Sequence, residues 1–116
     1  MQTAIARMEV TIMGNIPKHF TKFMETWPDV GRAYNSLGEA TANAGPLDEK
    51  IRSLIKLGFS VGSRMESAVK SHARKARAAG ATTDEIKHAV LLGMTTVGFP
   101  TTMAGLKWVE TALEED

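Results

Sequence analysis

Histidine is the side chain best able to move protons near neutral pH, and His72 has the most informative setting of the three histidines in this sequence. Met65, Val69, His72 and Ala76 recur at i, i+4, i+7 and i+11, a spacing that places them on one face of a helix. The imidazole is therefore expected to point with the apolar residues, toward a core or a pocket. Spacing alone leaves both a core histidine held by one hydrogen bond and a catalytic acid or base open.

The other two histidines predict no chemistry. His19 and His88 each lie beside a lysine and are expected at the surface or at an interface. Asp84 and His88, at i and i+4, have ligand spacing, but no second pair completes a metal site, so no metal is expected. No phosphate-binding glycine string is present either.

Charged residues cluster on the same segment as His72. Glu66 and Lys70 are spaced i, i+4, which is typical of a solvated ion pair and also suits a clamp for a substrate carboxylate. Residues 64–77 hold five bases and one acid, but no aromatic residue is interleaved with them. Lys+Arg total 14 and Asp+Glu total 13 in the whole chain, so no nucleic-acid partner is expected.

Composition predicts one globular domain over residues 1–116, with hydrophobic residues at 43% and charged residues at 23%. The absence of cysteine excludes disulfides, thiolate metal sites and thiol redox catalysis in this chain. No stretch approaches the roughly 20 apolar residues that span a bilayer, and the start of the chain does not read as a signal peptide. We expect a cytoplasmic protein without membrane contact.

Every apolar pattern has helical spacing, so the sequence predicts an all-α fold. Thr82-Thr83-Asp84-Glu85 is a capping box, and Gly80 and Gly98 are expected to end the helices before them. The fourth helix is expected to bury Leu47, Ile51, Leu54, Ile55, Gly58 and Val61, and the sixth is apolar almost all round, as in a helix at a core or subunit contact. The seven expected helices cover about residues 5–15, 17–27, 30–41, 46–61, 64–79, 82–97 and 101–113.

The order of these signals resembles a known family. Leu47-Asp48-Glu49-Lys50-Ile51-Arg52 opens one helix; His72-Ala73-Arg74-Lys75-Ala76-Arg77-Ala78-Ala79-Gly80, Glu85-Ile86 and Gly98-Phe99-Pro100 follow in turn. This series, over residues 46 to about 110, resembles the carboxymuconolactone decarboxylase family, which includes the alkyl-hydroperoxidase D-like proteins. The resemblance implies an all-α, alkyl-hydroperoxidase D-like domain of six to seven helices that forms an obligate homo-oligomer, a trimer or a hexamer.

The resemblance also implies one of two chemistries. The peroxidase-like branch has a cysteine pair where this chain has Met65 and Ala68, so thiol peroxidase chemistry is excluded. The decarboxylase branch needs no cofactor, and similarity to it makes His72 the expected acid/base, with Glu66 as a second catalytic residue. The expected substrate-binding residues for a small-molecule carboxylate are Arg64, Lys70, Thr101 and Thr102.

Three functions follow from this reading. The first is a cofactor-free lyase acting on a small carboxylated lactone or ring compound. The alternative is a catalytically inactive family member that serves as an oligomeric small-molecule-binding or scaffold protein, because Ser53 occupies the position where the family usually has an acid. The third is an oxidoreductase that works without thiols. Whether the chain is an enzyme therefore depends on whether His72 acts without that acid.

Overall fold

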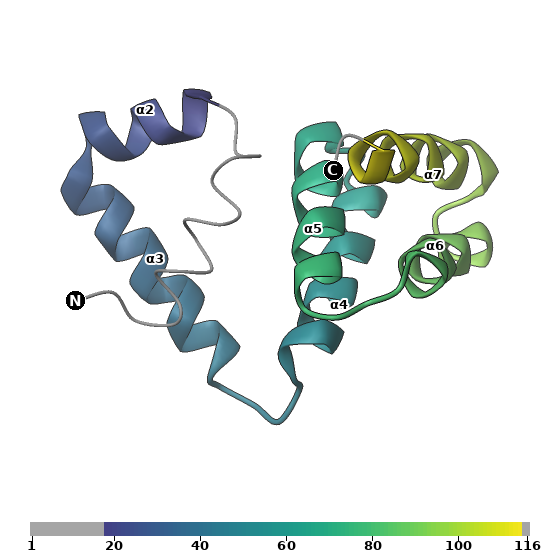
Figure 1. The fold of residues 1–116 in the computed structure, drawn as a ribbon, viewed down its shortest axis with the longest axis horizontal. Helices are drawn as coiled ribbons and strands as arrows, with labels where there is room; N and C mark the ends of the chain where they lie inside the picture. Colours follow the sequence, from purple (N-terminus) through teal and green to yellow (C-terminus); the bar gives the residue numbers. More distant parts are fainter. Residues whose placement is uncertain (1–17, 115–116) are drawn as a thin grey trace. The chain divides into compact units, whose positions relative to one another are not determined.

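The computed structural model describes residues 18–114, and every regular element in that range is helical, as the sequence predicts. The chain divides into two compact units between Pro46 and Leu47 (Figure 1). The helix expected over residues 5–15 lies outside the described residues. None of the helices within residues 18–114 is long and apolar enough to cross a membrane.

The first unit contains two helices, α2 (Lys18–Thr26) and α3 (Pro28–Ala42). Pro28 occupies the first turn of α3, where its missing N–H would have no intrahelical partner in any case. The rings of Phe23 and Trp27 lie 5.4 Å apart between centroids at a 51° tilt. Met24 comes so close to Gly31 that a Cβ there would lie 2.7 Å from the methionine sulfur. These contacts join the two helices at their shared corner.

An exposed apolar stripe runs along α3. Trp27, Val30, Tyr34 and Leu37 follow one another at helical spacing and remain 53–62% exposed. Gly31 is the only buried residue of α3, and α2 has none. The described residues of this unit therefore enclose no core of their own.

The second unit contains α4 (Glu49–Gly62), α5 (Glu66–Ala78), α6 (Thr83–Leu91), a short 3₁₀ segment η1 (Leu92–Thr95) and α7 (Phe99–Glu114). Figure 1 shows α4 and α5 side by side, with α7 beside α5 and α6 below it. A three-residue connection joins α4 to α5, so the two helices run antiparallel. Gly80 and Gly98 end their segments with φ of +100° and +96°, a conformation that glycine adopts without the penalty a Cβ brings.

The core lies in this second unit, where α4, α5, α6 and α7 meet. Gly105 allows the closest approach, because a Cβ there would lie 2.8 Å from Cγ1 of Val61 and 3.1 Å from Cγ1 of Val90. Both valines are almost fully buried, so they have little room to move. The buried apolar residues are Leu57, Val61, Val69, Ala73, Ala76, Ala81, Ile86, Val90, Val109, Ala112 and Leu113.

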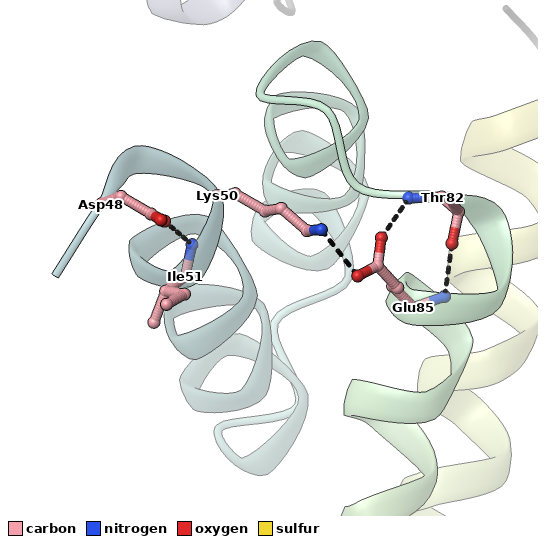
Figure 2. Close-up of polar contacts among 5 residues, drawn as sticks. All are labelled: Asp48, Lys50, Ile51, Thr82 and Glu85. Carbon is pink, nitrogen blue, oxygen red and sulfur yellow. Dashed lines mark hydrogen bonds and ion pairs between the residues drawn. The ribbon is translucent and has the colours of Figure 1, made fainter.

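Side-chain caps set where α4 and α6 begin (Figure 2). Asp48 accepts the Ile51 amide at 2.9 Å, and Thr82 accepts the Glu85 amide at 3.0 Å. The Glu85 carboxylate accepts the Thr82 amide at 2.9 Å, which completes the predicted capping box. Its other oxygen lies 2.6 Å from Nζ of Lys50, and this hydrogen bond is the largest cause of the lowered pKa of Glu85. One carboxylate thus links the start of α4 to the start of α6.

The structure corrects two of the expected helices. In α4, Leu57 and Val61 face the core, whereas Ile51, Ile55 and Gly58 are exposed, so most of the expected apolar face was wrong. The sixth helix was expected to reach residue 97, but α6 ends at Leu91 and the backbone tightens into η1. Leu91 and Leu92 are exposed there, so this stretch is not buried all round in the single chain.

Two matched glycine substitutions test the close approach at α7. We expect Gly105→Ala to lower the free energy of unfolding by about 1–3 kcal/mol, because the added methyl overlaps two buried valines. Gly58→Ala, in a helix position with nothing within 4 Å of the added carbon, should raise the free energy of unfolding by up to about 1 kcal/mol. Urea unfolding followed by circular dichroism measures both. Equal effects of the two substitutions would contradict the packing described here.

Candidate functional site

His72 lies at the edge of the buried face of α5. Val69, Ala73 and Ala76 are fully buried on that face, and the His72 side chain is half-buried next to them. Met65, which sequence spacing placed on the same face, is 57% exposed because it precedes the helix as its N-cap residue. His72 was expected to point inward, and the structure confirms this only in part. The ring is partly removed from bulk water but does not enter the core.

The environment of His72 disfavours a charged ring. The pKa of His72 is lowered from 6.5 to about 4, first by burial of the ring and then by the positive charges of Lys75 and Lys56. Lys75 lies one turn along α5, and Lys56 is contributed by α4. The imidazole is therefore neutral at pH 7, so in the free protein it is a proton acceptor rather than an imidazolium donor.

One ring nitrogen of His72 has no hydrogen-bond partner in the part of the chain that is described. Nδ1 is buried and makes no hydrogen bond with any group in residues 18–114. Buried polar atoms are nearly always hydrogen-bonded, so an unpaired one on a half-buried titratable ring is a mark of a functional position. This nitrogen is the second feature, after the pKa, that separates His72 from a core histidine.

Arg64 and Thr101, both expected to bind substrate, are brought together by the fold. Arg64 has a φ of +54°, the left-handed region that residues with a Cβ rarely occupy. From this position its Nη1 donates to Oγ1 of Thr101 at 2.7 Å, joining the α4–α5 connection to the first turn of α7. The pair presents a guanidinium at a helix N-terminus, a combination that attracts carboxylates.

Glu66 and Lys70 form a second pair of contacting side chains. The hydroxyl of Thr102 bonds to a backbone carbonyl instead. Nζ of Lys70 lies 3.1 Å from Oε2 of Glu66, as the i, i+4 spacing predicts. Neither residue is among the groups that shift the pKa of His72, because helical geometry turns both toward another side of α5. Thr102 is fully buried, and its hydroxyl donates to the Gly98 carbonyl at 2.8 Å across the first turn of α7.

Sequence reasoning missed the two lysines that act on His72. Lys75 is three residues from His72, and that spacing alone was available as a signal. Lys56 could be found only by knowing that α4 packs against α5.

His19 and His88 are exposed, as expected. Residues 18–114 contain no group of three or more His, Asp or Glu side chains able to hold a metal ion.

The lowered pKa of His72 predicts how stability changes with pH. The unfolded chain binds a proton at His72 near pH 6.5, whereas the folded chain binds it only near pH 4. Since the unfolded state binds more protons between these values, the free energy of unfolding should fall as the pH falls from 6.5 toward 5, above the range of ordinary carboxylates. Urea unfolding at a series of pH values measures this, and His72→Gln, which cannot titrate, should show a shallower fall.

A direct titration gives the same test at one residue. The imidazole ¹⁵N shifts of His72 should change near pH 4 in the folded protein and near 6.5 in urea. A midpoint near 6.5 in the folded protein would show that the ring is solvated and unaffected by the two lysines.

Comparison with known proteins identifies the family. The family model described as "Carboxymuconolactone decarboxylase family" matches residues 28–111. An uncharacterised protein of Haemophilus influenzae is 37% identical over 62 residues, which are 53% of this chain and 55% of that protein, so the match spans about half of the relative's length. The crystal structure of an apo carboxymuconolactone decarboxylase family protein from Legionella pneumophila has the same fold, with a TM-score of 0.76, 23% identity, and coverage of 90% of this chain and 94% of that one. The chain belongs to the carboxymuconolactone decarboxylase family.

Proposed function

We propose that this chain is a cofactor-free lyase that removes carbon dioxide from a small carboxylated lactone or related ring compound, with His72 as its acid/base. The observation that carries the proposal is the half-buried His72 ring, neutral at pH 7, with an unpaired Nδ1 and two lysines acting on it. Family membership supports a decarboxylase-like reaction, and the absence of cysteine removes the thiol alternative for this chain.

The reaction needs two things from the protein. When the bond to the carboxylate breaks, its electron pair passes into the conjugated lactone carbonyl, which becomes an enolate. A nearby cation stabilises that negative charge, and a proton must then be added to carbon. His72 can carry the proton, and Lys56 and Lys75 are the positive charges that act on its ring.

The two residue pairs beyond His72 have proposed roles of their own. The Arg64 guanidinium, oriented by Thr101, is proposed to bind a substrate carboxylate. Glu66 is proposed to hold the ammonium group of Lys70 in place, so that Lys70 contributes charge from the other side of α5. Thr102 is proposed to support the start of α7 rather than to contact substrate directly, because its hydroxyl is already bonded to Gly98.

One observation favours the alternative of a non-catalytic binding protein. Ser53, half-buried on α4, stands where the family usually has an acid, so any relay that depends on a carboxylate there is missing. A protein without that relay could keep the helical fold and bind a small molecule through the same cations.

Activity measurements decide between these functions. We expect the ultraviolet absorbance of a carboxymuconolactone-type substrate to change with the purified protein, and His72→Ala to reduce the rate by about 10²–10⁴-fold, as for loss of a general acid/base. His88→Ala, at an exposed histidine, is the matched control and should keep the parent rate. A parent protein that is folded but gives no turnover would remove the lyase function for this substrate class and leave the binding protein.

We also propose that copies of the chain associate, as a trimer or a hexamer, through an exposed apolar stripe that begins just before α4 and runs along it. Leu47, Ile51, Ile55 and Phe59 repeat at intervals of four residues and are 41–71% exposed in the single chain. An exposed apolar row of this length is typical of a surface that another protein surface covers. A second copy of the chain is the proposed occupant.

Substitution at the most exposed position of the stripe tests this association. Phe59→Asp should dissociate the oligomer, because it places a charge on a surface that must lose water on assembly. Ser67→Asp, at an exposed position of α5, should leave it intact. Sedimentation velocity at micromolar concentration measures both, and a parent protein that sediments only as a 12.6 kDa monomer would contradict the proposal.

A further inference from the structure

The apolar stripe on α3 has the spacing of a seam between packed helices. Its four residues recur at intervals of three, four and three, which is the a and d pattern of a coiled coil. They are Trp27, Val30, Tyr34 and Leu37, and each is more than half exposed. An exposed apolar row of this kind is usually covered by another helix or by another protein surface.

Small residues flank the α3 stripe and leave room for a close approach. They are Gly31 and Gly38 on one side, and Ala33 and Ala40 on the other. Met24 of α2 already covers Gly31, where a Cβ would lie 2.7 Å from the methionine sulfur. Around Gly38, seven residues further along, no described atom lies within 4 Å of the same position. The α2 helix therefore covers only the start of α3.

The sequence before α2 supplies an apolar face of matching period and length. Ile5, Met8 and Ile12 recur at intervals of three and four, the same a and d pattern, in the helix that the sequence predicts over residues 5–15. That segment lies outside the described residues. A helix over 5–15 would be about 15 Å long, and the α3 stripe extends over about 15 Å from Trp27 to Leu37.

The chain's own segment suits the stripe better than a second copy does. The compact unit that ends at Pro46 includes the start of the chain, and only Ile16 and Pro17 separate the expected helix from α2. A tethered segment meets the stripe at a high effective concentration. The two described helices have 9 and 15 residues and residues 18–46 enclose no core, and isolated helices of such length are marginal in water.

We propose that residues 5–15 form a helix that packs on the α3 stripe of the same copy of the chain, and so complete a three-helix unit with α2 and α3. Ile5, Met8 and Ile12 are the residues that cover the stripe. The family model begins at residue 28, so the segment precedes the part of the chain that the family accounts for. The inference is independent of the proposed lyase function, because it involves no residue of that site.

Cross-linking in the full chain tests which segment covers the stripe, and the absence of cysteine makes the test clean. Met8→Cys combined with Tyr34→Cys places one thiol near the middle of each apolar face, so a short bismaleimide should join them within one chain. Arg7→Cys combined with Tyr34→Cys is the matched control. Arg7 lies on another face of the expected helix, so this pair should react about tenfold more slowly. Peptide mapping of the monomer band measures both.

The fluorescence of Trp27 gives a second readout that needs no cross-linker. Trp27 and Trp108 are the two tryptophans, so Trp108→Phe leaves Trp27 as the reporter. In that background, Met8→Asp should shift the emission to the red and raise acrylamide quenching toward that of free tryptophan, because a charge cannot stay against the stripe. Arg7→Asp introduces the same residue on the polar face and should leave both unchanged. Circular dichroism checks that each variant is folded.

Each outcome supports or overturns the proposal. Faster cross-linking within one chain for the Met8 pair than for the Arg7 pair supports it, and this result does not depend on the Met8→Asp variant folding. Cross-links found only between chains, or protection of Trp27 that is lost on dilution, would assign the stripe to a second copy and overturn it. Equal rates for the two cysteine pairs, or a Trp27 in the Trp108→Phe protein as accessible as free tryptophan, would also overturn it.

Discussion

The close packing of α5 through small side chains is the constraint on which the rest of the structure depends. Val69, Ala73 and Ala76 are fully buried, and two of these three side chains are single methyl groups. Neighbouring helices can therefore approach the α5 backbone closely, which strips water from part of the adjacent His72 ring. The loss of water is the largest cause of the lowered pKa of His72. The chemistry of the ring is thus largely a result of how the core is packed, since no acid of residues 18–114 is among the causes of its pKa shift.

The chain combines a neutral ring with positive neighbours, and this arrangement differs from the usual histidine–carboxylate pair. A carboxylate beside a histidine would keep it charged in the absence of substrate. Here, Lys56 and Lys75 do the opposite, because both lower the pKa of the ring.

Sequence reasoning predicted most of the helical framework. The capping box at Thr82 and the stop at Gly80 are local signals, each read within a few residues, and both are confirmed. The apolar face of α4 was largely wrong because the helix has apolar residues on two sides. Periodicity cannot tell which of the two meets the core; only packing against α5 and α7 decides that Leu57 is buried and Ile55 is not. The end of α6 was missed because its apolar pattern continues unchanged into η1.

The candidate site shows the same division between local and long-range information. The inward tendency of His72 and the Glu66–Lys70 pair follow from spacing on one helix. The action of Lys56 on the ring depends on contacts between helices, as does the hydrogen bond from Arg64 to Thr101, and neither leaves a local signal. The left-handed conformation of Arg64 was also invisible, because such positions usually carry glycine or asparagine.

The connection between α4 and α5 has a consequence for the order in which the molecule folds. Its backbone hydrogen bonds are all local, from Ser63 to Phe59, Arg64 to Val61 and Met65 to Ser60. Closing so short a loop costs little chain entropy, so the antiparallel pair can form before distant segments arrive. The Arg64 side chain donates its hydrogen bond to Thr101, 37 residues later, so this bond must wait until α7 docks. The left-handed backbone of Arg64 can therefore form with the α4–α5 pair, whereas its side-chain hydrogen bond requires α7 in place.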